Sequence, residues 1–117
     1  MGRLTTHVLD TAHGTPGAGM ALTLYRRHGD RLEALRLVTT NAGGRIDAPL
    51  LEGDAFSPGC YRLVFAAGAY FRRRGVALPD PPFVDQVVVD FGVADATAHY
   101  HVPLLVSPWS YSTYRGS

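Results

Sequence analysis

Turn-forming residues recur about every ten positions along this chain of 117 residues, and most segments between them alternate apolar with polar side chains. This spacing is typical of an all-β sandwich built from short strands. Residues 67–74 break the alternation, contain good helix formers and are followed by Gly75, which predicts one short helix. We therefore expect an all-β fold with one helix, in which residues 1–117 form a single domain.

The alternating segments predict eight strands. Residues 10–19 separate the first two strands, and their three glycines and one proline indicate a loop. Thr5 and His7 are expected on one face of the first strand, opposite Val8, because side chains alternate along a strand. The eight expected strands lie at residues 4–9, 20–27, 32–39, 45–47, 60–66, 85–91, 98–106 and 109–115.

The composition narrows the possible partners and compartments. The 46% hydrophobic and 18% charged residues fit a compact globular protein, and a net charge of +1 argues against nucleic acid as the main partner. The basic run 72–74 is interpreted as a solvated helix end. No apolar run reaches the length of a signal peptide or a membrane span, so we expect no membrane partner and a cytoplasmic location. The single cysteine, Cys60, excludes an intrachain disulfide, and we expect it to be a buried, inert thiol.

One expected strand has the character of an unprotected sheet edge. Residues 86–89, Gln-Val-Val-Val, favour β structure, lack proline, and carry no charge between Asp85 and Asp90. An exposed edge of this kind pairs with another chain unless something covers it. The segment therefore predicts edge-to-edge pairing in a symmetric dimer.

The five histidines fall into two groups. His13 lies in the glycine-rich loop and His28 in a hairpin turn, and both are expected to be solvated and without a role. His99 and His101 share one face of their strand, and with His7 they could form a three-histidine metal site. No acidic residue close in sequence is available to orient such ligands, so the metal site is the weaker interpretation and we expect none.

A polar small-molecule site without metal is the stronger interpretation. A neutral imidazole can take a proton from water near neutral pH, and hydrolysis of an activated amide also needs a cation where negative charge develops. His7 and His101 are the candidate bases, and Arg45 and Arg115 are the candidate binders of that charge. Arg45 follows a glycine turn, and an exposed loop arginine without a role remains the alternative for it.

The C-terminal seven residues, Tyr-Ser-Thr-Tyr-Arg-Gly-Ser, are rich in hydrogen-bond donors and directly follow an apolar strand. Chain termini are usually frayed, so a donor-rich end of this kind suggests a tail that is held in place and used. Tyr114 and Ser117 could bond a polar heterocycle or could simply complete an edge strand. No Gly-x-Ser-x-Gly motif or phosphate-binding glycine loop is present.

These segments together resemble a known family. His-Val-Leu-Asp at 7–10, Arg45 after its glycine turn, Tyr-His-Val-Pro-Leu-Leu at 100–105 and Tyr-Arg-Gly-Ser at 114–117 are similar to motifs of the transthyretin-related 5-hydroxyisourate hydrolases. The resemblance covers residues 4–117. It implies a transthyretin-like β-sandwich of two four-stranded sheets with one short helix. It also implies a homotetramer, a dimer of dimers, with active sites in the channel between the dimers.

The resemblance further implies a reaction and the residues that perform it. The family hydrolyses 5-hydroxyisourate to 2-oxo-4-hydroxy-4-carboxy-5-ureidoimidazoline in urate degradation, and no cofactor is implied. The two imidazoles would bind substrate and activate water, and the arginine after the glycine turn would hold a carbonyl. The implied catalytic residues are His7, Arg45, His101 and Ser117, and the implied substrate-binding residues are His7, Arg45, Tyr114 and Arg115.

One position departs from the family pattern, and two other functions compete. Many relatives carry an acidic residue where this chain has Gly43, which bears on how the turn orients Arg45. The main alternative is a small-molecule binding protein of the transthyretin type, which would share the fold without catalysis. A generic immunoglobulin-like interaction module is the second alternative, and it would not depend on His7 or His101.

Overall fold

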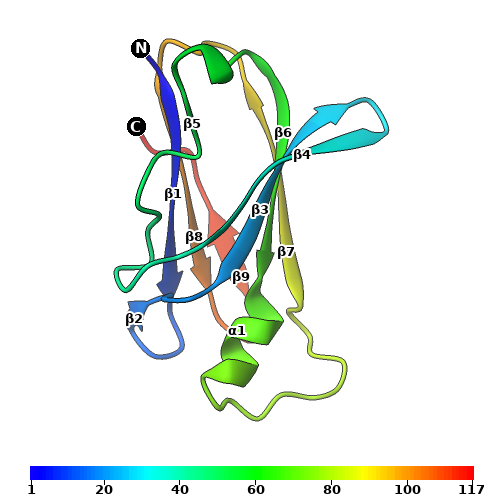
Figure 1. Ribbon diagram of the computed structural model, residues 1–117. Coiled ribbons are helices and arrows are strands. Elements are labelled where there is room, and N and C mark those ends of the chain that lie inside the picture. Colours follow the sequence, from blue (N-terminus) through cyan, green and yellow to red (C-terminus); the bar gives the residue numbers. More distant parts are fainter.

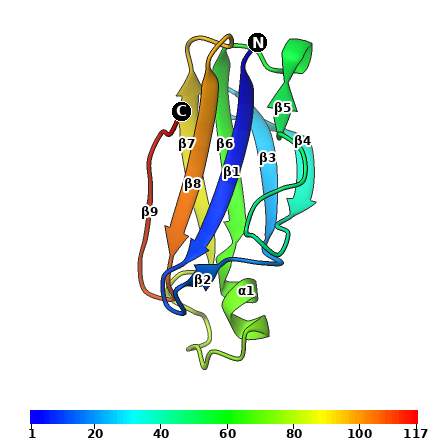
Figure 2. The ribbon, with the colours of Figure 1, turned by 90° about the vertical axis from the view of Figure 1, so that its left-hand side faces the viewer.

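The computed structural model describes residues 1–117 as two β-sheets packed face to face, with a short helix, α1 (Ala67–Arg73), at one end (Figure 1). One sheet has the order β4-β3-β6-β7 and is antiparallel throughout. The other has the order β2-β1-β8-β9, with β5 also paired to β1. β1 and β8 run parallel at its centre, where they lie side by side in Figure 2. The strands are β1 (Arg3–Asp10), β2 (Thr15–Pro16), β3 (Ala21–His28), β4 (Arg31–Thr39), β5 (Leu51–Glu52), β6 (Gly59–Ala66), β7 (Gln86–Val93), β8 (His99–Val106) and β9 (Tyr111–Thr113), and a 3₁₀ turn spans Gly53–Ala55.

The core forms between the sheets from the inward side chains of each strand. Along β1 the burial alternates strictly: Leu4 and Val8 are fully buried, whereas Thr5 and His7 face outward and are half-buried. β8 alternates less strictly: its first three residues, His99 to His101, are half-buried, and Val102 to Leu104 are buried. The hydrophobic alternation of β1 therefore fixes which of its side chains remain on the outer surface. No helix in the structure is long and apolar enough to cross a membrane.

The sandwich with one short helix confirms the expected fold class, and three details differ. The second sheet has five strands because the two-residue β5 adds to β1. β2 forms within the expected loop at residues 10–19. The expected strand at 45–47 is wrong: only Arg45 forms a bridge, to His7, before the chain turns away toward Pro49, which has no N–H to donate.

Cys60 is exposed, so the expectation of a buried thiol was wrong. The reason is which side chains of β6 face the core: Tyr61 and Leu63 take the inward positions and are fully buried, so the residues between them face outward. Cys60 precedes them and points to the outer face of the sheet.

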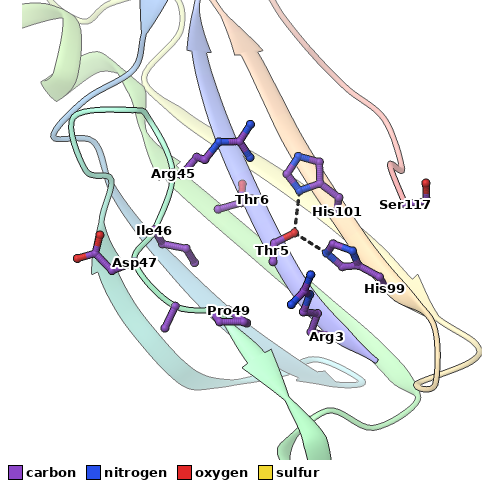
Figure 3. A pocket seen from close by; sticks show the side chains of 11 residues that line it. Arg3, Thr5, Thr6, Arg45, Ile46, Asp47, Pro49, His99, His101 and Ser117 are labelled. Carbon is purple, nitrogen blue, oxygen red and sulfur yellow. Dashed lines mark hydrogen bonds between the residues drawn. The ribbon is translucent and has the colours of Figure 1, made fainter. Parts of the chain in front are cut away.

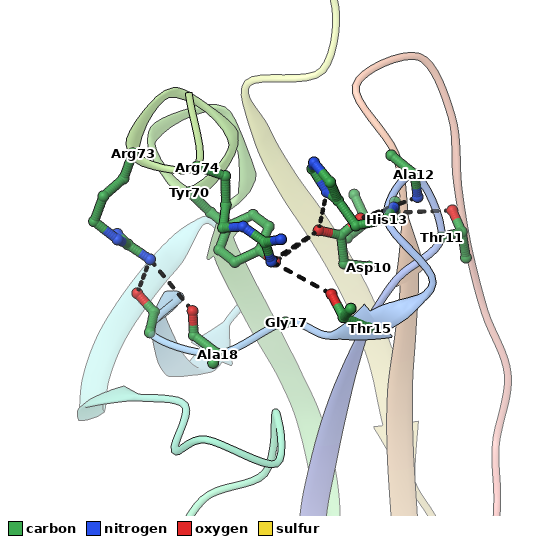
Figure 4. Close-up of polar contacts among 12 residues, drawn as sticks. Asp10, Thr11, Ala12, His13, Thr15, Gly17, Ala18, Tyr70, Arg73 and Arg74 are labelled. Carbon is green, nitrogen blue, oxygen red and sulfur yellow. Dashed lines mark hydrogen bonds and ion pairs between the residues drawn. The ribbon is translucent and has the colours of Figure 1, made fainter. Parts of the chain in front are cut away.

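Asp10, at the end of β1, ties that strand to α1 and to the following loop (Figure 4). Its carboxylate is buried, lies 2.7 Å from both the Tyr70 hydroxyl and His13 Nδ1, and lies 3.6 Å from Arg74 Nη1. Burial opposes the charge, but the hydrogen bonds from Tyr70 and His13 hold the pKa of Asp10 below its ordinary value. His13 and Arg74 are exposed, as expected, but they are also engaged with this carboxylate.

Candidate active site

The candidate site lies on the outer face of the sheet that contains β1 and β8. In the parallel register of these strands, Arg3 is opposite His99 and Thr5 is opposite His101. The side chains of His99 and His101 both reach Thr5, which confirms that they share a face. The pairing therefore brings residues nearly one hundred positions apart in sequence into direct contact.

The Thr5 hydroxyl lies between the two imidazoles (Figure 3). Its Oγ1 is 2.9 Å from His99 Nε2 and 2.8 Å from His101 Nδ1. Figure 3 also shows that the other ring nitrogen of His101 points away from Thr5, on the side where Arg45 lies. No hydrogen bond within the chain engages this nitrogen, so it is free to meet a ligand.

Arg45 is positioned by the glycine before it. Gly44 has a φ of +74°, and its carbonyl accepts a 2.8 Å hydrogen bond from the Val8 N–H. A Cβ at residue 44 would lie 2.3 Å from the Val8 carbonyl oxygen, so only glycine allows this approach to β1. The contact places Arg45 opposite His7, with an exposed side chain that lines the hollow described below.

His7 is held from the same turn. Its Nε2 is 3.0 Å from the carbonyl oxygen of Gly43. A carbonyl oxygen only accepts, so Nε2 carries the proton and Nδ1 keeps its lone pair. Gly43 thus contributes through its backbone, and its N–H is in turn fixed by the Asn41 side chain.

The C-terminal tail returns to His101. The N–H and carbonyl of Gly116 exchange hydrogen bonds of 2.7 and 3.2 Å with the backbone of His101. A Cβ at residue 116 would lie 3.2 Å from the His101 side chain, so the tail approaches the imidazole as closely as a glycine permits. This contact brings Ser117 to the site, and it bears out the expectation that the tail is held in place.

A hollow of about 360 Å³ opens between these segments. Its size fits a small heterocycle better than a peptide or a nucleic acid. Three of the sequence-predicted residues, Arg45, His101 and Ser117, line it, and His7 adjoins it through its pairing with Arg45. The other polar side chains of its wall are Arg3, Thr5, Thr6, Asp47 and His99.

Two predicted substrate-binding residues lie elsewhere in this chain. Tyr114 and Arg115 line a second hollow of about 220 Å³, between the free edges of the two sheets. The Arg115 guanidinium lies 4.4 Å from the centre of the Tyr100 ring and donates to the His99 carbonyl at 3.3 Å. The structure therefore does not bring these two residues to the hollow of His101.

The electrostatics of the site favour neutral imidazoles. Burial lowers the pKa of His101, and the positive Arg45 nearby lowers it further, with smaller contributions from His99 and His7. Burial and Arg45 also lower the pKa of His7, against the opposing effect of the Gly43 carbonyl. Both rings are therefore uncharged at neutral pH and can accept a proton.

No three side chains of His, Cys, Asp or Glu are arranged to hold a metal ion. The sequence reasoning also missed Thr5, whose signal was its place two residues before His7 on the same strand face. Its partners could not be found without knowing that β1 pairs with β8.

The fold and the imidazole-lined hollow define a class: transthyretin-like sandwiches with a polar site on the outer face of one sheet. The chain belongs to the HIUase/Transthyretin family, whose sequence model matches residues 4–116. It is 63% identical over 117 residues to the 5-hydroxyisourate hydrolase of Ralstonia nicotianae, covering 100% of both chains. It is 62% identical to the corresponding hydrolase of Pseudomonas aeruginosa, covering 100% of this chain and 93% of the relative. The solved structure of Klebsiella pneumoniae 5-hydroxyisourate hydrolase matches with a TM-score of 0.82 at 36% identity, covering 100% of both chains.

Proposed function

We propose that this chain hydrolyses a ring amide of 5-hydroxyisourate to give 2-oxo-4-hydroxy-4-carboxy-5-ureidoimidazoline, a step of urate degradation. The observation that carries the proposal is the convergence of Arg45, His101 and Ser117 on one small polar hollow from three distant segments. The relatives named for this activity, at 62 and 63% identity over 117 residues, support the same substrate.

His101 is the general base of the proposed mechanism. Its free ring nitrogen takes one proton from water as the water oxygen bonds to the ring carbonyl carbon. The carbon–nitrogen bond then breaks, its electron pair stays on nitrogen, and the leaving nitrogen takes the proton back from His101. The lowered pKa of His101 keeps the base available at neutral pH.

The other predicted residues bind and orient the substrate in this proposal. Arg45 holds the carbonyl oxygen and stabilises the negative charge that develops there, as its exposed guanidinium permits. His7 offers its Nδ1 lone pair to a ring N–H, and Ser117 donates from the tail. The substrate-binding role of Tyr114 and Arg115 stays a prediction, because within one chain they reach a different hollow.

We also propose the homotetramer, a dimer of dimers, as the working assembly. β7 and β9 each end a sheet, and neither carries a partner strand on its outer side. Symmetric pairing of these edges would make the dimer, and the face that carries the hollow would then lie between two dimers. Covering that face would exclude water from the reacting groups and strengthen the interaction of Arg45 with the substrate.

The test is the decay of freshly generated 5-hydroxyisourate, followed by ultraviolet absorbance with and without a chelator. The wild-type chain should accelerate the decay, the chelator should not slow it, and His101→Ala should lower turnover ~10²–10⁴-fold, as loss of a general base does. His28→Ala, in an exposed hairpin far from the hollow, is the matched control and should be fully active. Decay at the uncatalysed rate with the folded wild-type chain would instead favour the binding-protein alternative.

A further inference from the structure

The Thr5 hydroxyl joins His99 and His101, and its single proton limits how the two rings can be protonated. Oγ1 lies within hydrogen-bond distance of one nitrogen of each ring, at 2.9 and 2.8 Å. A hydroxyl donates one hydrogen bond and accepts others. The structure gives Thr5 Oγ1 no other hydrogen-bond partner, so the hydroxyl proton must go to one of the two rings. If both rings are neutral, the other ring then donates to Oγ1.

Two arrangements of these protons are possible, and they differ at Nε2 of His101, the nitrogen that faces the hollow. In the first, His101 Nδ1–H donates to Thr5 and the hydroxyl donates to His99 Nε2, which leaves the lone pair of His101 Nε2 free. In the second, every bond is reversed, and His101 Nε2 carries a proton. Only the first arrangement gives His101 a nitrogen that can act as a base toward the hollow.

The position of Arg45 favours the first arrangement. Its guanidinium can only donate hydrogen bonds, and it lies on the side of His101 Nε2 (Figure 3). A lone pair at Nε2 meets this positive group favourably, whereas an N–H would point one donor at another. Both groups line the same hollow, so this interaction acts where substrate would bind.

We propose that Thr5 is a positioning residue of the reaction, which holds His101 in the Nδ1–H tautomer by donating its own proton to His99. The effect of Thr5 on turnover rests on the proposed function, whereas its effect on the His101 tautomer does not. In this proposal His99 contributes to the reaction without touching the substrate, because it supplies the acceptor that orients the Thr5 hydroxyl. The β1–β8 register, which sets Thr5 opposite His101, builds this arrangement into the sheet.

The arrangement also couples the two rings. If His99 takes a proton, its Nε2–H donates to Thr5, the hydroxyl turns to His101 Nδ1, and His101 is left with its proton on Nε2. Protonation of either ring therefore removes the base, so the acid side of the activity profile should depend on two protons. The other charged or titratable groups that face the pair are Arg3 and His7 of β1, Arg45 and Asp47 of the loop before β5, Glu52 of β5, and Arg115 of the tail.

The first test needs no substrate: the tautomer of His101 in the folded protein, read at neutral pH from two-bond ¹H–¹⁵N correlations of the imidazole. The wild type and Thr5→Ser should show Nδ1–H, because both keep the hydroxyl. Thr5→Val, which is close in shape, leaves the half-buried Nδ1–H of His101 without its only acceptor and should shift the ring toward Nε2–H. A wild type already in the Nε2–H form, or a valine variant that does not change, would overturn the proposal whether or not the chain is a hydrolase.

The second test is kinetic. Thr5→Val should lower kcat by about 10²-fold, toward the smaller end of the loss expected for a missing general base, with KM little changed and with Thr5→Ser restoring most of the rate. The order of the acid limb should fall from two protons to one. Thr11→Val, which removes a comparable hydroxyl bond just beyond the other end of β1, is the matched control and should keep the wild-type rate and slope. A valine variant with full kcat and an unchanged slope would contradict the coupling.

Discussion

At the scale of single residues, the two imidazoles next to Arg45 present different nitrogens. His101 is bonded through Nδ1 to Thr5, so its Nε2 faces the hollow. His7 is bonded through Nε2 to the Gly43 carbonyl, so its Nδ1 is the free nitrogen. One arginine beside both rings lowers the pKa of each, after burial. The same cation thus keeps two potential bases neutral and remains available for a substrate oxygen.

These pKa shifts predict how activity and stability depend on pH. The pKa values of His7 and His101 lie below the ordinary value of 6.5, so activity should be level near neutral pH and fall only on the acid side of 6.5. The unfolded chain binds these protons at higher pH than the folded chain does. The free energy of unfolding should therefore also decrease as pH falls from 6.5 toward the folded pKa values. Between pH 8 and 5, NMR titrations would measure the two pKa values, kcat/KM profiles would measure the activity, and urea midpoints would measure the stability.

Replacing Arg45 tests whether its positive charge causes part of these pKa shifts. Arg45→Gln removes the second-largest cause of both shifts, so the NMR titrations of His7 and His101 should move upward. His28→Ala, at a residue bonded to Glu33 far from this site, is the matched control and should leave the titrations of His7 and His101 where they are. An activity profile that stays flat from pH 8 to 5 would argue against a neutral imidazole as the base.

The sequence predicted the position of a residue where that position depends only on neighbours along the same strand. The period of two along a strand was sufficient to place His99 and His101 on one face. The Thr5 contact depends on a parallel pairing between strands more than 90 residues apart, and no local pattern encodes that. Cys60 was assigned to the wrong side because the phase of its strand is set by Tyr61 and Leu63, which fill the core.

At the scale of elements, the tail continues the antiparallel pairing of β9 along β8. β9 pairs with β8, and after a short gap Gly116 pairs with His101. This second contact, and not the strand itself, brings Ser117 to the hollow. The expected strand at 109–115 is shorter in the structure, at Tyr111–Thr113, because only these three residues remain in register with β8.

Gly116→Ala should therefore impair the site more than it destabilises the fold. The added methyl group would lie 3.2 Å from Cβ and Cδ2 of His101, so the tail or the imidazole must shift by a few tenths of an ångström. We expect kcat/KM to fall by roughly tenfold through misplacement of reacting groups, with a loss of unfolding free energy below about 1 kcal/mol. Kinetics and urea denaturation would measure the two effects separately. Gly92→Ala, where an added Cβ meets no atom within 4 Å, is the control; equal effects of both substitutions would remove the special role of Gly116.

Predicting elements from the sequence succeeded where hydrophobic alternation was long and failed where pairing was short. β3, β4 and β6 match their expected ranges to within one residue at each end. β2 and β5 have two residues each and form only because β1 offers free backbone groups beside them. Segments of this length carry no periodic signal of their own.

At the scale of the whole molecule, the free edges of the two sheets lie on the same side of the sandwich. The hollow lined by Tyr114 and Arg115 also has Val89 and Phe91 of β7 in its wall, so the β7 edge and the tail after β9 are adjacent. A second copy related by a twofold axis could therefore extend both sheets at once. The opposite edge strand, β4, has no comparable neighbour, since the other sheet ends there in the two-residue strands β2 and β5.

This arrangement predicts an assembly that depends on β7 and not on β4. Sedimentation velocity at micromolar concentration should show a particle of four 12.6-kDa chains. Val88→Lys places a charge on the exposed side of β7 and should shift the particle toward smaller species, because a lysine on an edge strand opposes pairing with another chain. Leu37→Lys, at an even more exposed apolar position on β4, is the matched control and should leave the particle unchanged. A wild-type monomer would exclude the assembly altogether, and dissociation by Leu37→Lys alone would move the interface to the opposite edge.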